Sequence, residues 1–207
     1  MKIEDQQIEN QQINKSKINK SKLFGWILPL IVAVAVALVA WHCFRDRIYV
    51  VEGDAMSPTL KRGQNVWVEY GGVVRRNDIV LVSNPFAQKG AALAPMFRRC
   101  FCVPGDTITR LQAHQLYGPA VVPRCGTKVH LNYANYMIYK DLAMKYEGVR
   151  MEWRDTVCTV DGTIADTYTF RRDYVFLTND NRADKCDSRT FGPVPREVIG
   201  AKIKFVF

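Results

Sequence analysis

The chain has 207 residues, of which 48% are hydrophobic, and its formal net charge is +9. This length permits one sizeable hydrophobic core with an appendage, and it excludes two large domains. The basic residues are scattered and match no zinc-finger or helix-turn-helix pattern, which argues against nucleic acid as a partner. A basic face beside anionic membrane lipids is the favoured interpretation, with ordinary solvated surface charge as the alternative.

Residues 1–22 form the first predicted segment. They are rich in Gln, Asn, Lys and Ile, contain no proline or glycine, and offer little apolar mass for a core. This composition predicts a mobile tail.

Residues 23–44 follow without a charged side chain when His42 is neutral. At 1.5 Å per residue, a helix of this length would measure about 33 Å, enough for the roughly 30 Å hydrocarbon core of a bilayer. We therefore predict one N-terminal transmembrane helix, with Trp26 and Trp41 as interfacial anchors. A cleaved signal peptide is the alternative, but its apolar region would be only about 7–15 residues long.

The charges beside this segment predict its orientation. Lys15, Lys17, Lys20 and Lys22 precede it, and Arg45 and Arg47 follow it. Because lysine-rich flanks tend to stay in the cytoplasm, residues 1–22 are expected there as a cytoplasmic tail. Residues 45–207 are then expected on the other side of the membrane.

Residues 45–207 contain short runs of β-branched and aromatic residues, which predict a mainly β, antiparallel domain. The expected strands are Ile48 to Val51, Asn65 to Tyr70, Asp78 to Val82, Arg98 to Val103, Thr156 to Val160, Thr167 to Phe170, Tyr174 to Leu177 and Ala201 to Phe207. Asp161-Gly162 is typical of a two-residue hairpin turn. Apolar residues at helical spacing predict a helical insertion near residues 133–147, with its aromatic side chains in the core.

Six cysteines are present, and Cys43 lies at the expected membrane boundary. The other five belong to a compartment where disulfides can persist, and their odd number leaves at least one unpaired within that domain. No zinc-ligand spacing is recognisable, so structural thiols or one or two disulfides are favoured over a metal site. The five are Cys100, Cys102, Cys125, Cys158 and Cys186.

Three segments of the chain, here called boxes, carry recognisable motifs. The first box, residues 53–60, reads Gly-Asp-Ala-Met-Ser-Pro-Thr-Leu. It resembles the nucleophile segment Gly-x-Ser-Met-x-Pro-Thr-Leu of one enzyme family, the bacterial type I signal peptidases. Ala55 stands where the family has its catalytic serine. A methyl group cannot attack a carbonyl, so the usual nucleophile is missing.

The second box, residues 96–106, ends in Pro-Gly-Asp and resembles the segment that carries the family's general-base lysine. Arg98 occupies the position of that lysine. Burial can lower the pKa of a lysine toward neutrality, whereas a guanidinium keeps its proton in essentially any protein environment. Both members of the Ser-Lys dyad are therefore replaced.

The third box, residues 178–189, resembles the family pattern Gly-Asp-Asn-x-x-x-Ser-x-Asp-Ser-Arg. Two positions depart from it, because Asn179 replaces the glycine and Lys185 replaces the serine that orients the lysine. Asn179 is expected to adopt a left-handed backbone conformation, which asparagine tolerates better than most residues. The matching residues are Asp180, Asn181, Asp187, Ser188 and Arg189.

The resemblance implies a membrane-anchored, signal-peptidase-type antiparallel β domain that needs no cofactor. Family members remove N-terminal signal peptides from exported proteins at the bacterial cytoplasmic membrane. By the same resemblance, Gly53, Met56 and Pro58 shape a cleft for small side chains, and Asp187 with Arg189 forms a supporting ion pair. Arg98 is expected to pair with Asp180 or Asp187.

Three functional interpretations follow. The favoured one is a catalytically inactive relative that binds signal peptides of exported precursors or pairs with an active signal peptidase. The second is an active peptidase with a shifted site that uses Ser57 and Lys185, although the favoured interpretation of Lys185 is a surface lysine in a polar loop or a partner of Asp187. The third is a non-enzymatic envelope adaptor whose contact surface is the helical insertion at Tyr133 to Tyr146, with Tyr136 and Tyr139 as the residues whose mutation should abolish partner capture.

Overall fold

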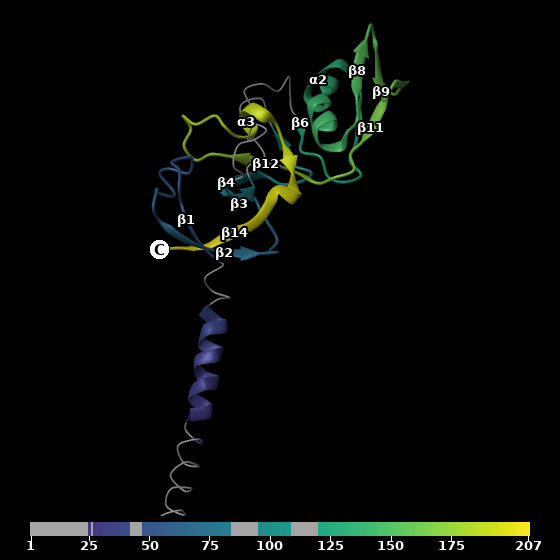
Figure 1. The fold of residues 1–207 in the computed structure, drawn as a ribbon. Helices are drawn as coiled ribbons and strands as arrows, with labels where there is room; N and C mark the ends of the chain where they lie inside the picture. The colour runs from purple at the N-terminus through teal and green to yellow at the C-terminus, as the bar shows by residue number, and fades with distance from the viewer. Residues whose placement is uncertain (1–24, 26, 42–46, 84–94, 109–119) are drawn as a thin grey trace, which may run out of the picture. The chain divides into compact units, whose positions relative to one another are not determined.

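The computed structural model describes residues 25, 27–41, 47–83, 95–108 and 120–207 (Figure 1). The chain is divided into two compact units, residues 1–47 and residues 48–207. In the first unit, residues 27–41 are helical and their large apolar side chains are exposed. None of the described helices combines the length and the apolar character that crossing a membrane requires. The predicted tail 1–22 and both ends of the predicted span 23–44 lie outside the described residues.

The second unit is built on a seven-stranded sheet in the order β1-β2-β14-β3-β4-β12-β13 (Figure 1). Every neighbouring pair in this sheet is antiparallel, as the sequence predicts. The strands are β1 (Ile48–Val50), β2 (Asn65–Tyr70), β3 (Ile79–Ser83), β4 (Pro95–Cys102), β12 (Tyr174–Thr178), β13 (Val194–Pro195) and β14 (Ile199–Val206).

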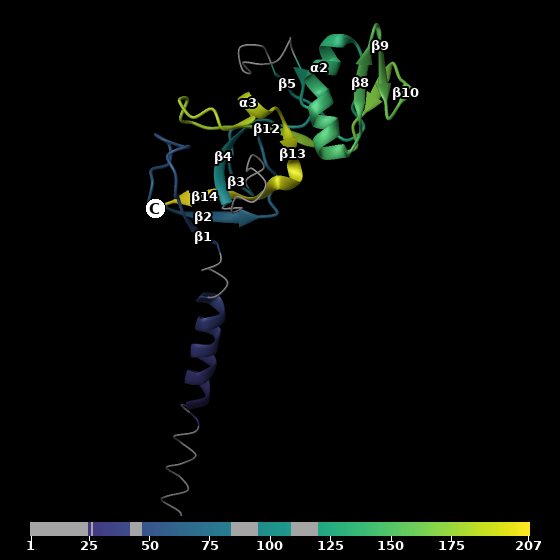
Figure 2. The same cartoon turned by 45° about the horizontal axis from the view of Figure 1, so that its top comes forward.

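Smaller elements follow β4 along the chain and lie to one side of this sheet (Figure 2). Two two-stranded sheets and one three-stranded sheet accompany the helix α2 (Tyr133–Leu142) and the π-helix η1 (Ala143–Glu147). The strands are β5 (Thr107–Ile108), β6 (Ala120–Val121), β7 (Lys128–His130), β8 (Met151–Arg154), β9 (Val157–Val160), β10 (Thr163–Ile164) and β11 (Thr167–Thr169). The helix α3 (Ser188–Phe191) and the 3₁₀-helix η2 (Arg196–Val198) precede β14.

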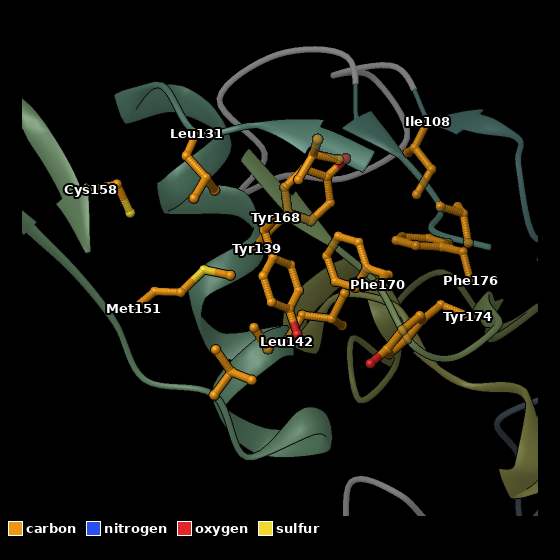
Figure 3. Packing of buried hydrophobic residues seen from close by; sticks show 14 of the residues in the cluster. Ile108, Leu131, Tyr139, Leu142, Met151, Cys158, Tyr168, Phe170, Tyr174 and Phe176 are labelled. Carbon is orange, nitrogen blue, oxygen red and sulfur yellow. The ribbon is translucent and has the colours of Figure 1, made fainter. Parts of the chain in front are cut away.

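An aromatic core joins these smaller elements to the large sheet (Figure 3). Phe170 lies at its centre, with edge-on contacts to Tyr139, Tyr168 and Tyr174. Such edge-to-face pairs add about 0.5–1.5 kcal/mol each beyond the burial of apolar area. Because Phe176 on β12 belongs to the same cluster, packing here also fixes the strand that leads into the third box.

The predicted hairpin at Asp161-Gly162 and the predicted helical insertion near residues 133–147 have different outcomes. The hairpin is confirmed, since Val160 pairs with Thr163 across Asp161 and Gly162, both of which have positive φ. The predicted helical insertion is present, but it is not one regular helix. The chain widens into a π-helical turn after Leu142, and Gly148 ends it in a left-handed conformation that a side chain would strain.

Tyr136, Tyr139 and Tyr146 of α2 and η1 face the core, as predicted, whereas Tyr133 at the start of α2 is exposed. Tyr139 is buried, and its hydroxyl donates to the backbone oxygen of Val121 at 2.9 Å while it accepts from the backbone N–H of the same residue at 3.0 Å. Tyr136 is partly buried against the same core. The adaptor hypothesis therefore needs correction, because a buried Tyr139 cannot belong to a contact surface.

The five cysteines of the second unit are free thiols. Cys100, Cys102 and Cys158 are buried, whereas Cys125 and Cys186 are exposed. Of the two predicted alternatives, structural thiols and disulfides, the structure has the thiols.

Candidate active site

Ala55 and Arg98 line one pocket of about 180 Å³. A pocket of this size suits small side chains. Its walls are mostly apolar, and the only ionisable groups among the lining residues are Glu52 and Arg98. The lining is completed by Val51, Glu52, Gly53, Met56, Met96 and Phe97.

The sheet brings the three boxes together. The first box lies in the connection between β1 and β2, and the second begins on β4. Thr178 at the end of β12 pairs with Arg99 of β4, so the third box starts beside the second. Asn181 then closes the arrangement, because its backbone N–H donates to the Ala55 oxygen at 3.0 Å and its side-chain amide to the Asp54 oxygen at 3.3 Å.

Asp180 links all three boxes through its carboxylate. Thr59 of the first box donates its hydroxyl to Asp180 Oδ2 at 2.6 Å, and Arg99 of the second box donates from Nε and Nη2 at 2.6 and 2.5 Å. Burial opposes the ionisation of Asp180, but the hydrogen bonds from Arg99 and Thr59 together lower its pKa below the ordinary value. The motifs in the sequence predicted no role for Thr59 or Arg99.

The Asp180 carboxylate is expected to make stability depend on pH. A carboxylate whose pKa is lowered by folding stabilises the protein above its unfolded pKa of about 3.9, and the contribution disappears as the pH falls through the folded value. Asp180→Asn should cost about 1 kcal/mol at pH 7, because solvent screens the partly exposed pair. Urea unfolding at pH 7 and pH 3 measures this, and a cost that persists undiminished at pH 3 would contradict it.

Arg98 extends from β4 into the protein and is only 2% exposed. Its Nη1 donates to the Phe97 oxygen at 2.9 Å, and its Nη2 donates to Met96 Sδ at 3.4 Å and the Cys186 oxygen at 3.3 Å. The Nε–H is buried without a hydrogen-bond partner. Burial lowers the pKa of this guanidinium, although the charges of Asp184 and Asp187 act in the opposite direction.

The prediction that Arg98 forms an ion pair with Asp180 or Asp187 is wrong. Asp180 pairs with Arg99 at 2.5 Å, and Asp187 pairs with Arg189 at 2.7 Å. Arg98 and Arg99 point to opposite faces of β4, as successive strand residues do, so Arg99 reaches the carboxylate that sequence reasoning assigned to its neighbour. Within the described residues, no carboxylate forms a salt bridge with Arg98.

Replacing Arg98 with methionine is expected to stabilise the protein. A buried charge without a partner opposes folding, and an apolar side chain of similar length removes that penalty. We expect Arg98→Met to raise the free energy of unfolding by about 1–3 kcal/mol, measured by urea unfolding of the detergent-solubilised protein. A decrease would show that the hydrogen bonds of Arg98 outweigh its desolvation.

Asp187 and Arg189 form a buried ion pair inside the third box. The Asp187 side chain is fully buried and accepts from the backbone N–H of Asn179 at 2.8 Å, as well as from the backbone and side chain of Arg189. Ser188 accepts a bond at 3.1 Å from the backbone N–H of Leu177 on β12. The pair predicted from the family pattern is confirmed.

Residues 23–207 match the family model for signal peptidase, peptidase S26. The chain belongs to this signal peptidase family. Signal peptidase I of Bacillus licheniformis is 35% identical over 90 residues, which are 42% of this chain and 45% of that relative. Signal peptidase I of Bacillus amyloliquefaciens is 27% identical over 188 residues, which are 88% of this chain and 83% of that relative. The first alignment thus spans less than half of the relative's length.

Asn179, which replaces the family glycine, does not adopt the left-handed conformation expected for it. Among the described residues, the non-glycine positions with positive φ are Asn77, Asp155 and Asp161. Asn179 is instead buried and donates its side-chain amide to the Asp184 oxygen at 3.3 Å. The bond from its backbone N–H to Asp187 holds the same turn without a positive φ.

The other residues predicted from the signal peptidase pattern differ in whether they line the pocket. Gly53 and Met56 line it, whereas Pro58 is exposed and Ser57 is half-buried, and neither of these two is among the lining residues. Lys185 is exposed, and its backbone oxygen accepts from Thr190 Oγ1 at 2.6 Å. The Asp187 carboxylate is bonded to Arg189, so Lys185 is a surface residue rather than its partner.

The thiols of β4 are poor substitutes for the missing serine. Burial, with smaller contributions from nearby acidic groups, raises the pKa of Cys100 to about 12 and that of Cys102 to about 11. Because the thiolate is the reactive form, both side chains are essentially inert at neutral pH. In the described part of the chain, no group of three or more His, Cys, Asp or Glu residues is arranged to hold a metal ion.

Proposed function

We propose that this chain binds signal peptides of exported precursors and does not cleave them, because it lacks the Ser-Lys dyad. The observation that carries the proposal is that Ala55 and Arg98 line the same pocket, in a site where hydrogen bonds still join the three boxes. Ala55 offers no nucleophile, and Arg98 keeps its proton, so neither half of the dyad chemistry is available.

The pocket supports binding without cleavage. Its small volume and apolar walls suit the small side chains that the family resemblance implies before a cleavage point. The hydrogen bonds of Asp180 and Asn181 hold the first box in place, which makes the pocket largely preformed. A preformed pocket loses less conformational entropy when a peptide binds.

The proposal includes a location in the bacterial cytoplasmic membrane. Residues 23–44 would form a single-pass anchor, with residues 1–22 in the cytoplasm and residues 45–207 outside. The exposed apolar side chains of the described helical residues 27–41 support this assignment. Membrane lipids, exported precursors and an active signal peptidase are the partners that this location offers.

The proposed function is tested with the purified full chain in detergent and a fluorogenic signal-peptide substrate. We expect no cleavage above spontaneous hydrolysis, together with saturable binding of the same peptide measured by fluorescence anisotropy. Cleavage at a useful rate would overturn the proposal, and so would a complete lack of binding.

An active enzyme with a shifted site is the first alternative. It requires Ser57 as nucleophile and Lys185 as base, and neither side chain lines the pocket. A displacement of about 1 Å can cost a hundredfold in rate, which weakens this alternative. If the wild-type chain cleaves the substrate, Ser57→Ala and Lys185→Ala should each abolish turnover under this hypothesis.

An envelope adaptor is the second alternative, and one surface favours it. Tyr133, Tyr136 and Trp153 contact one another with ring centroids 5.6–6.4 Å apart, and Tyr133 is 58% exposed. Aromatic residues are enriched in protein interfaces. Loss of partner capture in a Tyr133→Ala, Tyr136→Ala variant, with no affinity for signal peptides in the wild type, would favour the adaptor.

A further inference from the structure

Among the residues that the structure describes, the Arg98 guanidinium forms no salt bridge with a carboxylate. Its neighbours are carbonyl and thioether acceptors, and its Nε–H has none. The segments 84–94 and 109–119, which the structure does not describe, contain no Asp or Glu, so every carboxylate of residues 48–207 belongs to a described residue. None of them forms a salt bridge with Arg98. The charges of Asp184 and Asp187 favour the guanidinium from nearby, so a group that is 2% exposed is partly compensated but has no directly bonded carboxylate in this unit.

This unpaired charge borders an apolar pocket. Arg98 lines the pocket together with Ala55, Met56 and Phe97. A single carboxylate attached to a small apolar group matches both features, because the oxygens neutralise the guanidinium and the apolar group fills the rest of the pocket. Arginine binds carboxylates with two parallel hydrogen bonds, which single carbonyl oxygens cannot reproduce.

The donors that such a carboxylate requires are present on Arg98. The Nε–H has no partner, and one Nη2–H is directed at Met96 Sδ, which is a weak acceptor at 3.4 Å. Methionine has three flexible side-chain bonds, so Met96 can move to admit an oxygen. Nη1 would keep its bond to the Phe97 oxygen.

We infer that the pocket binds the C-terminal carboxylate of a peptide that ends in small residues, with Arg98 as its counter-ion. The inference rests on the proposed function and names its ligand more narrowly: the product of signal-peptide cleavage rather than the intact precursor. Cleavage converts an internal peptide carbonyl into a terminal carboxylate. Only the carboxylate carries the negative charge that a salt bridge with Arg98 requires. The chain would thus recognise signal peptides released by an active peptidase.

Glu52 at the exposed rim of the same pocket gives this inference a second prediction. Its negative charge would repel an approaching carboxylate, although solvent weakens that effect. We expect Glu52→Gln to tighten binding of the acid peptide by about twofold and to leave the neutral peptide unchanged.

The test compares two synthetic peptides that end in Ala-Gln-Ala and differ only at the C-terminus, one a free acid and the other an amide. Binding to the full chain in detergent is measured by competition against a labelled copy of the acid. We expect the acid to bind at least about tenfold tighter than the amide. Arg98→Met should bind both equally weakly, whereas Arg172→Met, which removes an exposed arginine, should keep the full preference.

The outcomes separate this inference from the proposed function. Equal binding of acid and amide by the wild-type chain, or a preference that survives in Arg98→Met, overturns the inference while leaving signal-peptide binding intact. If neither peptide nor the intact signal peptide binds, both fail. Because Arg98→Met is expected to be more stable than the wild type, its loss of preference cannot result from unfolding, and a melting curve verifies this.

Discussion

A chain that carries both Ala55→Ser and Arg98→Lys is expected to cleave a fluorogenic signal peptide, whereas the wild-type chain does not. Ala55 and Arg98 line the same pocket, so the substitutions restore the nucleophile and the base to a shared site. Loss of a catalytic serine elsewhere costs about 10⁶-fold in rate. An incomplete repair should therefore still exceed the wild-type rate by about a thousandfold.

The surroundings of position 98 favour a lysine with catalytic capacity. The site is almost fully buried, and no carboxylate of the described residues forms a salt bridge there, so burial outweighs the opposing charges of Asp184 and Asp187. Burial without a counter-ion lowers the pKa of a lysine, which then accepts the serine proton near neutral pH. Cleavage by the repaired chain should rise with pH as this lysine loses its proton.

Matched variants define the controls for the repair. Ala55→Ser alone retains the arginine and Arg98→Lys alone lacks the hydroxyl, so both single variants should stay silent. Ser57→Ala in the repaired background should leave the rate unchanged, because Ser57 does not line the pocket. A repaired chain that melts normally yet cleaves nothing would show that other changes, with Asn179 and Lys185 the first to examine, have disabled the site.

Sequence patterns predicted those features of the fold that depend on neighbouring residues. Alternating β-branched residues located β2 to the residue, and Asp161-Gly162 identified the hairpin, because both signals express local backbone preference. The strands β5, β6 and β13 were missed, since two residues carry too little periodicity to be recognised. The strands β7 and β8 were missed as well. The π-helical turn was missed for a different reason: apolar residues at helical spacing do not distinguish a π-helical turn from the α-helix that precedes it.

The site was predictable as a set of positions but not as a set of contacts. The three boxes meet as the family pattern implies, and the Asp187–Arg189 pair is present. The partners of Arg98 and Arg99 were not predictable, because alternation along β4 and the register with β12 decide which arginine reaches Asp180. Two adjacent arginines look equivalent in a sequence, yet one is paired and the other is not.

The buried pair in the third box is expected to dominate the stability of the site. Asp187 accepts four hydrogen bonds from Asn179 and Arg189 counted over backbone and side-chain donors, and it is the N-cap of α3. Asp187→Ala should lower the free energy of unfolding by about 3–5 kcal/mol, because Arg189 then remains buried without its counter-ion. Urea unfolding of the detergent-solubilised chain, followed by tryptophan fluorescence, measures the loss.

Two further variants test whether the unpaired arginine causes that loss. Asp141→Ala removes an exposed aspartate on α2 and should change stability by no more than about 0.5 kcal/mol. Asp187→Ala combined with Arg189→Met should be less destabilising than Asp187→Ala alone, because the second change removes the stranded charge. Costs that simply add would show that the carboxylate acts through the cap and the turn at Asn179 and not through the ion pair. Arg189 forms a salt bridge with a carboxylate of the protein, whereas Arg98 is inferred to bind a carboxylate of the ligand. Additive costs would remove the support for this difference between the two arginines.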